Sequence, residues 1–208
     1  SIPADTAICD RCLRDMTEGR RKGYPFTTCT DCGARFTLMR SLPYDRDKTS
    51  LDEFPMCQTC KKEYVDPKDR RFHHQTVCCP ECGPRYFLLD RNGKALPGDP
   101  ITGFASMLSE GRFGIAKSWG GMHICSVPER IPELREWYGR KQKPFAIMVR
   151  DADSVTKYAL PTEKEMERLT SPGRPIVLLK KIINDITEAA SPGLDNIGVF
   201  LPHTGMQH

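Results

Sequence analysis

Eight of the ten cysteines in this 208-residue chain stand in four CxxC pairs. In chain order the pairs are Cys9-Cys12, Cys29-Cys32, Cys57-Cys60 and Cys79-Cys82. Pairing neighbours gives Cys-x2-Cys-x16-Cys-x2-Cys and then Cys-x2-Cys-x18-Cys-x2-Cys. Both spacings are typical of a tetrahedral all-thiolate zinc site, which leaves no open coordination position and is therefore structural. The sequence thus predicts two structural zinc ions with these eight cysteines as ligands.

Three other uses of paired cysteines fit the pattern less well. A disulfide framework needs an oxidising compartment, and four consecutive CxxC pairs are an awkward way to cross-link a chain. Iron–sulfur clusters also take four cysteines, but their motifs are less evenly paired. A thioredoxin-like redox pair needs a CxxC at the start of a helix in a βαβ unit, and no such pattern surrounds these pairs.

Residues 1–90 contain an internal repeat built on the two cysteine sets. The first copy ends in CTDCGARF at 29–36, and the second ends in CPECGPRY at 79–86. Between the cysteine pairs, two arginines at 20–21 in the first copy match two arginines at 70–71 in the second. We therefore expect two similar modules that follow one another along the chain.

Each repeat has too few large apolar residues to bury a core, so metal binding must supply much of its folding free energy. Gly33 and Gly83 directly follow the last ligand of each set, where we expect a left-handed backbone. His73 and His74 are rival ligands by residue type, but eight paired cysteines already complete both sites. Cys78 has no CxxC partner and is predicted to be a spare thiol.

Composition bounds the class of protein. Hydrophobic residues make up 38% of the chain and charged residues 28%, which is normal for a globular protein. No apolar run approaches the length of a membrane span, and the first residues do not form a signal peptide. Ten cysteines without a secretory signal indicate a reducing compartment, which predicts a cytoplasmic protein without a membrane partner.

The net charge argues against a nucleic-acid partner. The formal charge is +4, but eight thiolates and two zinc ions change it to about zero. Residues 1–90 hold 15 lysines and arginines against 14 acidic residues. A nucleic-acid binder shows a basic excess, and this chain does not.

The pattern changes after residue 96 to alternating helices and strands. We expect helices from Pro100 to before Gly111, over 132–138, and from the Thr162–Glu165 capping box to about Leu169. We expect strands at 113–117, 145–149, 175–179 and 197–201. The fold class is therefore α+β: two four-cysteine modules at 1–48 and 49–92, then a partial α/β domain at 97–208 with a mainly parallel or mixed sheet.

Cations and glycines occur in the loops beside the predicted strands. Ligands of open α/β sheets bind outside the carboxyl ends of the strands, so these loops predict an anionic ligand such as a nucleotide. The alternative is that they are plain glycine turns and solvated charged turns. The candidate binding residues are Lys117, Gly120, Gly121, His123, Arg140, Lys143, Ser171 and Arg174. No catalytic residue is predicted.

Specific segments resemble a known family. The fingers resemble those of the HypF family in YPFTTCTDCG at 24–33, LPYDR at 42–46 and DRRFH at 69–73. The second region resembles the first part of the YrdC-like domain that follows those fingers. The segments that carry this likeness are KSWGGMHI at 117–124, Arg140, KPFAIMV at 143–149, SPGRPIVL at 171–178 and GVFLP at 198–202. The likeness covers nearly the whole chain in the family's order.

The resemblance implies an activity. HypF is the carbamoyltransferase of [NiFe]-hydrogenase maturation: carbamoyl phosphate and ATP, the latter with Mg²⁺, give a carbamoyl-adenylate. The carbamoyl group then passes to the C-terminal cysteine of HypE and becomes cyanide on iron. By matching motifs, Lys117, Arg140 and Lys143 would bind phosphates or carbamate, and Ser171 and Arg174 would line the nucleotide pocket.

The resemblance also has limits. Two positions depart from the family pattern, because Tyr138 stands where a lysine is usual and Ser126 where an acid is usual. The rest of the YrdC-like domain lies outside the chain, so we expect this region to be inactive alone. The alternative to an enzyme is a non-catalytic zinc-ribbon module with a YrdC-like platform that binds RNA or a nucleotide.

Overall fold

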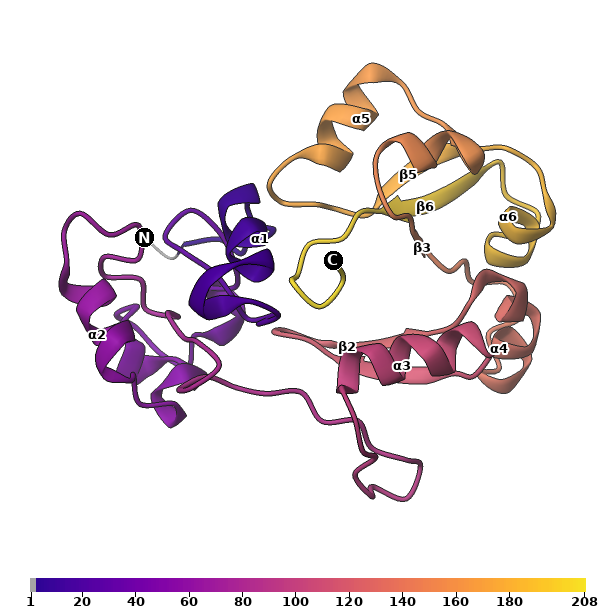
Figure 1. Ribbon diagram of the computed structural model, residues 1–208. Coiled ribbons are helices and arrows are strands. Elements are labelled where there is room, and N and C mark those ends of the chain that lie inside the picture. The colour runs from indigo at the N-terminus through magenta and orange to yellow at the C-terminus, as the bar shows by residue number, and fades with distance from the viewer. Residues whose placement is uncertain (1–2) are drawn as a thin grey trace. The chain divides into compact units, whose positions relative to one another are not determined.

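The computed structural model describes residues 3–208, which pack into two compact units (Figure 1). Unit one runs up to Tyr86 and also contains residues 117–121 and 203–208. Unit two consists of residues 87–116 and 122–202. Both cysteine sets lie in unit one, and the domain boundaries expected near residues 48, 92 and 97 stay predictions.

Two short helices organise unit one. Helix α1 spans Asp10–Thr17 and helix α2 spans Gln58–Val65. Each begins directly after the first cysteine of a CxxC pair, so the second cysteine lies on the first helical turn. Most of the remaining chain in this unit is turns, with 3-10 segments at Gly19–Arg21, Phe36–Leu38, Arg46–Lys48 and Ser50–Glu53.

The apolar interior of unit one is small. One cluster centres on Tyr24, Phe26, Leu38 and Leu51, and two others consist mainly of the cysteines and their neighbours. Arg46 links the segment between the fingers to this unit, because its guanidinium donates to the carbonyls of Gln75, Val77 and Phe54 at 3.0, 2.8 and 2.7 Å. Polar contacts therefore carry much of the packing.

The two glycines after the cysteine sets differ. Gly33 has the expected left-handed backbone, with φ +98°. The same expectation was wrong for Gly83, whose φ is not positive. A Cβ on Gly83 would lie 2.0 Å from Tyr24 Oη and 2.7 Å from Cys78 Cβ, so glycine is needed there for close packing.

Unit two contains four α-helices: α3 (Pro100–Ser109), α4 (Ile131–Trp137), α5 (Glu163–Thr170) and α6 (Asp185–Ala190). The Asp99 side chain caps α3 by accepting from Thr102 N at 2.8 Å. The Thr162–Glu165 capping box begins α5 as expected. Helix α6 was not predicted, although an Asn184 cap precedes it. Further 3-10 segments lie at Pro128–Arg130 and Asp153–Lys157.

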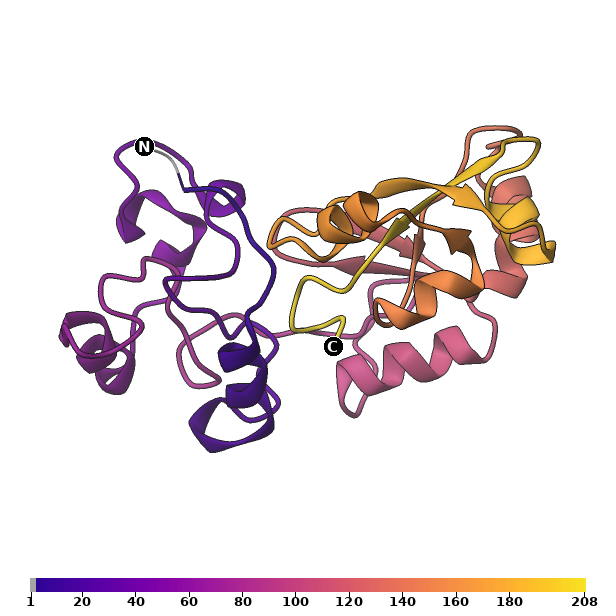
Figure 2. The ribbon, with the colours of Figure 1, turned by 90° about the horizontal axis from the view of Figure 1, so that it is seen from above.

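The strands that follow the fingers in the chain form two sheets. Strands β1 (Gly114–Lys117) and β2 (Met122–Cys125) make a two-stranded sheet. The larger sheet has the order β3-β6-β5-β4, where β3 is Ile147–Met148, β4 is Ala159–Leu160, β5 is Val177–Lys181 and β6 is Asn196–Phe200. Figure 2 shows β5 and β6 side by side. The sheet is mixed, because β3–β6 is parallel whereas β5–β6 and β4–β5 are antiparallel.

The predicted strand at 175–179 is observed two residues later. Pro175 cannot donate to a neighbouring strand, and β5 runs on through Lys180 to Lys181. Lys181 is tolerated in the interior because its ammonium donates to Ser191 O at 2.8 Å and pairs with Glu188 at 2.6 Å.

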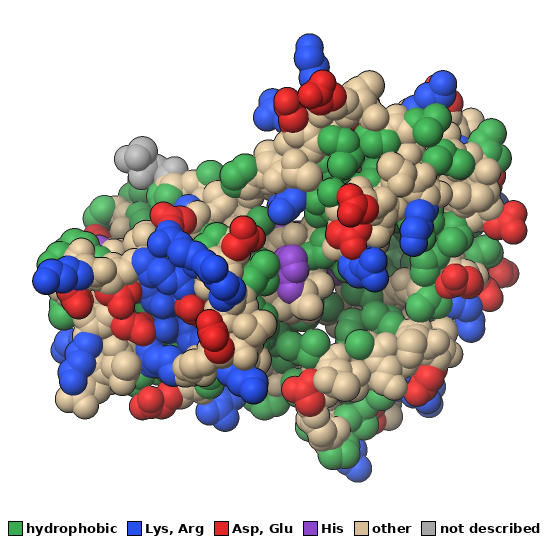
Figure 3. Space-filling view, turned by 45° about the horizontal axis from the view of Figure 1, so that its top comes forward, with side chains coloured by type: hydrophobic (Ala, Val, Ile, Leu, Met, Phe, Trp, Pro, Cys, Tyr) green, Lys and Arg blue, Asp and Glu red, His purple; other side chains and the backbone are tan. Residues whose placement is uncertain are grey.

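The main core lies on one face of the larger sheet. Leu179, Ile197 and Val199 are fully buried there and pack with Leu169 of α5 and Ala190 of α6. Leu178 and Lys180, the alternate residues of β5 on the other face, are exposed, whereas Gly198 of β6 is buried. Figure 3 shows hydrophobic side chains spread over the visible part of unit two. Within residues 3–208, no helix is long and apolar enough to cross a membrane.

The alternation in β5 allows a matched test of this core. We expect Leu179→Ala to lower the free energy of unfolding by about 2–5 kcal/mol, because it leaves a cavity at a fully buried position. Leu178→Ala, one residue away and 63% exposed, should change it by less than about 0.5 kcal/mol. Chemical denaturation of both variants measures the difference, and equal effects would contradict the assignment of the core face.

Candidate metal centres and anion-binding loops

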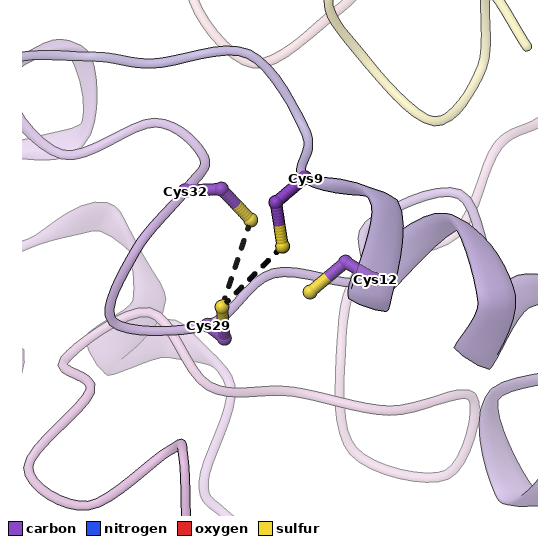
Figure 4. Close-up of side chains that lie close together, drawn as sticks. All are labelled: Cys9, Cys12, Cys29 and Cys32. Atoms are coloured by element: carbon purple, nitrogen blue, oxygen red, sulfur yellow. Dashed lines mark hydrogen bonds between the residues drawn. The ribbon is translucent and has the colours of Figure 1, made fainter. Parts of the chain in front are cut away.

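The sulfurs of the first cysteine set converge on one point (Figure 4). Cys9 and Cys12 come from the start of α1, and Cys29 and Cys32 come from a turn later in the chain. Cys29 Sγ lies 3.8 Å from both Cys9 Sγ and Cys32 Sγ. A tetrahedral zinc with bonds of about 2.3 Å separates its sulfur ligands by about 3.8 Å. The geometry therefore fits one zinc ion.

The second set has the same geometry. Cys79 Sγ lies 3.7 Å from Cys57 Sγ and from Cys82 Sγ, and Cys82 Sγ lies 3.6 Å from Cys60 Sγ. A hollow of about 380 Å³ beside Cys57 and Cys82 makes this set the more exposed of the two. The structure thus brings the eight predicted cysteines together as two groups of four that fit two zinc ions.

Arginine side chains lie against the sulfurs. Arg70 Nη1 is 3.1 Å from Cys12 Sγ, and Arg20 Nη2 is 3.4 Å from Cys60 Sγ. Hydrogen bonds from a cation favour the thiolate form that a metal ligand needs. The sequence showed these arginines as part of the repeat, but gave no sign of their partners.

The other candidate ligands of the fingers lie outside both groups of four. Cys78 is buried, receives a hydrogen bond from Tyr24 Oη at 3.5 Å, and burial raises the pKa of its thiol to about 11. His74 is also buried, with Thr28 Oγ1 and Thr76 Oγ1 at 2.9 and 3.1 Å from its Nε2. His73 is exposed and has φ +52°.

The Gly-Gly loop of the predicted anion site belongs to unit one. Lys117 is exposed at the end of β1, and Gly121 O accepts from Ser118 N at 3.0 Å. A Cβ on Gly120 would lie 2.5 Å from Thr37 Cγ2, so this glycine allows close packing. Trp119 lies edge-on to Phe26, with the ring centroids 4.8 Å apart. His123 lies half-buried on β2, in unit two.

Arg140 is held by the loop before β3. Its Nη2 donates to Pro144 O at 2.9 Å, and its guanidinium carbon lies 4.7 Å from the centre of the Phe145 ring. Arg135 donates to the carbonyls of Arg140 and Lys143 at 2.7 and 3.0 Å, which fixes the loop between them. The structure thus brings the predicted residues Arg140 and Lys143 onto one loop.

Ser171 and Arg174 form a turn before β5. Arg174 N donates to Ser171 O at 2.9 Å, and Ser171 Oγ donates to Arg168 O at 2.6 Å. Arg174 has φ +43°, which is unusual for a residue other than glycine. The Nε atoms of Arg174 and Arg140 are both buried without a hydrogen-bond partner among residues 3–208.

Two family models match parts of this chain. The model of the HypF finger family matches residues 8–39 and 56–89. A family described as Telomere recombination, which includes the YrdC proteins, matches residues 106–208. The carbamoyltransferase HypF of Rhodobacter capsulatus is 41% identical over the whole chain, and the probable carbamoyltransferase HypF of Methanocaldococcus jannaschii is 43% identical.

Solved structures are also similar. The crystal structure of HypF from T. kodakarensis covers the whole chain at 43% identity with a TM-score of 0.93. Full-length HypF in a phosphate- and nucleotide-bound form covers 99% of the chain at 40% identity with a TM-score of 0.90. The chain spans 28% of the length of each of these four relatives.

The fold and the cysteine sites define a protein with a tandem pair of four-cysteine zinc fingers and a YrdC-like region. The chain belongs to the HypF family. Its relatives in that family are named as carbamoyltransferases, which makes them enzymes.

His74 makes the stability of the fingers depend on pH. Burial is the main reason that its pKa falls to about 3, with Arg35, Arg71 and Arg21 lowering it further and Cys29 opposing them. Since the unfolded histidine titrates near 6.5, protonation favours the unfolded chain below that pH. The stability that the neutral His74 contributes is therefore fully present above pH 6.5 and is lost progressively as the pH falls toward 3.

We expect His74→Gln to reduce the loss of stability between pH 7 and pH 5, by up to about 1.4 kcal/mol per pH unit. Unfolding curves of the zinc-loaded chain at several pH values measure this slope. Protonation of the thiolates changes the free energy of unfolding equally in the original protein and in the variant. The effect of His74 is therefore the difference between their two slopes. His73→Asn, at the exposed neighbouring position, is the control. A slope unchanged in His74→Gln would contradict this account.

Proposed function

We propose that this region is the zinc-finger pair and nucleotide-binding part of an ATP-dependent carbamoyltransferase. The parent protein forms carbamoyl-adenylate from carbamoyl phosphate and ATP. It then passes the carbamoyl group to the C-terminal cysteine of HypE, for the cyanide ligand of [NiFe]-hydrogenases. The eight cysteines hold two structural zinc ions, and the thiolates that this requires are maintained in the reducing cytoplasm.

The observation that carries the adenylation proposal is the pair of buried, unpartnered Nε atoms on Arg140 and Arg174. Buried polar groups without a partner are rare, and each calls for an explanation such as a ligand. Both arginines lie in loops beside strands of a sheet in the YrdC-like region. The relative solved in a phosphate- and nucleotide-bound form supports the same ligand class.

The chemistry needs cations rather than an acid or base. Water first cleaves carbamoyl phosphate to carbamate and inorganic phosphate. A carbamate oxygen then attacks the α-phosphorus of ATP, the bond between that phosphorus and the bridging oxygen breaks, and pyrophosphate leaves. Negative charge builds on the α-phosphate and on the departing pyrophosphate. Lys117, Arg140 and Lys143 would balance the charge of the phosphates and carbamate. Mg²⁺ bound to ATP would neutralise part of the same charge.

The other predicted residues have supporting roles. Ser171 and Arg174 would line the nucleotide pocket. The positive φ of Arg174 costs of order 1 kcal/mol. Gly121, where a Cβ would meet nothing within 4 Å, leaves room for a phosphate to approach the backbone, whereas Thr37 fills the space beside Gly120. His123 remains a predicted binding residue for the same class of ligand.

We expect Arg140→Ala, made in an intact parent protein, to lower adenylate formation by about 10²- to 10³-fold, as for loss of one positioned charge-stabilising group. Carbamoyl-phosphate-dependent ATP–pyrophosphate exchange measures this step. Zinc content should stay at two per chain, because Arg140 lies outside the fingers. Lys141→Ala, an exposed neighbour, is the matched control. Full exchange activity in Arg140→Ala would remove Arg140 from the mechanism.

The same assay distinguishes the non-catalytic alternative. Exchange in the intact parent supports the enzyme. Absence of exchange together with tight RNA binding would instead favour a zinc-ribbon module with an RNA-binding platform. The near-zero charge of the metal-loaded chain argues against that outcome.

A further inference from the structure

Two arginines of the first finger contact the metal site of the second. Arg21 donates to both carboxylate oxygens of Glu63 at 2.9 and 2.5 Å, and Arg20 donates to Glu63 Oε1 at 2.8 Å. Arg20 also lies 3.5 Å from Cys57 Sγ and 3.4 Å from Cys60 Sγ. Glu63 stands on α2, three residues after Cys60, so these contacts cross from one finger to the other.

Two arginines of the second finger make the equivalent contacts to the first finger. Arg70 and Arg71 both pair with the carboxylate of Asp15, which stands on α1 three residues after Cys12. Arg70 also donates to Cys12 Sγ at 3.1 Å. Each arginine pair therefore joins the acid and the sulfur of the other finger's helix.

The arginines also donate hydrogen bonds to backbone carbonyls of the other finger. Arg21 Nε donates to the carbonyl of Cys78 at 2.9 Å, and Arg71 Nε donates to the carbonyl of Thr28 at 3.0 Å. Cys78 and Thr28 are the residues directly before Cys79 and Cys29, the third ligands of the two sets. The buried arginine of each finger thus also fixes the peptide that leads into a ligand of the other.

Arg21 and Arg71 are buried, so their contacts with the other finger are needed to offset the cost of removing a charge from water. Arg21 is 2% exposed and Arg71 is 5% exposed. A buried guanidinium is stable only where acids, carbonyls or thiolates satisfy it. Here an acid and a carbonyl of the neighbouring finger do so for each arginine. A zinc ion with four thiolates carries a net charge of −2, which gives each arginine pair a further anionic partner.

We propose that the two metal centres are coupled through these reciprocal arginine pairs, so that each finger supplies the cations that stabilise the other finger's thiolates. Arg20 and Arg21 lie in the loop that the first metal closes, and Arg70 and Arg71 lie in the loop that the second metal closes. Loss of one metal frees its loop, removes the arginines from the other site, and weakens that site. By reciprocity, each ion strengthens the binding of the other.

The distinguishing prediction is a crossed effect. We expect Arg20→Gln to weaken the zinc site of Cys57, Cys60, Cys79 and Cys82, although Arg20 belongs to the first finger. We expect Arg70→Gln to weaken the site of Cys9, Cys12, Cys29 and Cys32. Substituting groups that contact metal ligands typically lowers affinity by about 10- to 100-fold. Arg20 and Arg70 are partly exposed, so both variants should retain the fold.

The zinc-loaded 208-residue chain is treated with a chelator and iodoacetamide, and peptide mass spectrometry follows alkylation of each cysteine over time. Arg20→Gln should speed alkylation most at Cys57 and Cys60, and Arg70→Gln most at Cys9 and Cys12, each by about 10-fold or more. Arg40→Gln, which breaks an exposed ion pair with Glu53, is the control and should change neither. Effects confined to each variant's own finger, or no effect, would overturn the proposal.

Coupling itself is measured by adding one equivalent of Zn²⁺ to the metal-free chain and counting bound ions by native mass spectrometry. The fraction of chains with a single ion should rise in the Arg20→Gln, Arg70→Gln double variant, and an unchanged fraction would overturn coupling. If either glutamine variant unfolds, Arg20→Lys and Arg70→Lys keep the charge and must show the crossed pattern in weaker form. Coupling between the metal centres does not depend on carbamoyl transfer, so the result for Arg140→Ala does not affect it.

Discussion

Coordination of a metal by four thiolates is the interaction on which the structure of residues 3–86 depends. Their buried apolar side chains form only small clusters, of which the largest centres on Tyr24, Phe26 and Leu51. Such clusters bury too little surface to offset the loss of chain entropy. Two ions, each joining a helix start to a distant turn, supply the missing free energy. The sulfur geometry fits this role and leaves no open position for a substrate.

The two fingers share one interior rather than standing as independent modules. Phe26 of the first finger stacks on Tyr86 of the second, with ring centroids 4.6 Å apart. Tyr24 of the first finger contacts Cys78 of the second, and His74 of the second contacts Thr28 of the first. Like the arginine contacts, both connect one finger to the other. The repeat therefore has two consequences, because each copy builds a metal site and also completes the site of its partner.

Local signals were sufficient to predict the cysteine sets, the capped helices α3 and α5, and most strands, because each depends on residues close in sequence. Partners distant in sequence were not predictable. Arg21 reaches Glu63, 42 residues away, and two equivalent repeats give no local sign of whether such pairs form within or between copies. Strand β4 is only two residues long and carries no periodic pattern. His73 has a left-handed backbone, as does Gly23 at the equivalent position of the other copy, with φ +68°. A histidine gives no local sign of that conformation, whereas a glycine does.

The most direct test of the central claim is hydrogen exchange, measured by mass spectrometry before and after zinc removal by a chelator under reducing conditions. The zinc-loaded chain should hold two ions. Removing them should abolish protection in residues 8–86, while the amides of β5 and β6 stay protected, because their core contains no metal ligand. Protection of residues 8–86 that survives complete removal of both ions would contradict the account.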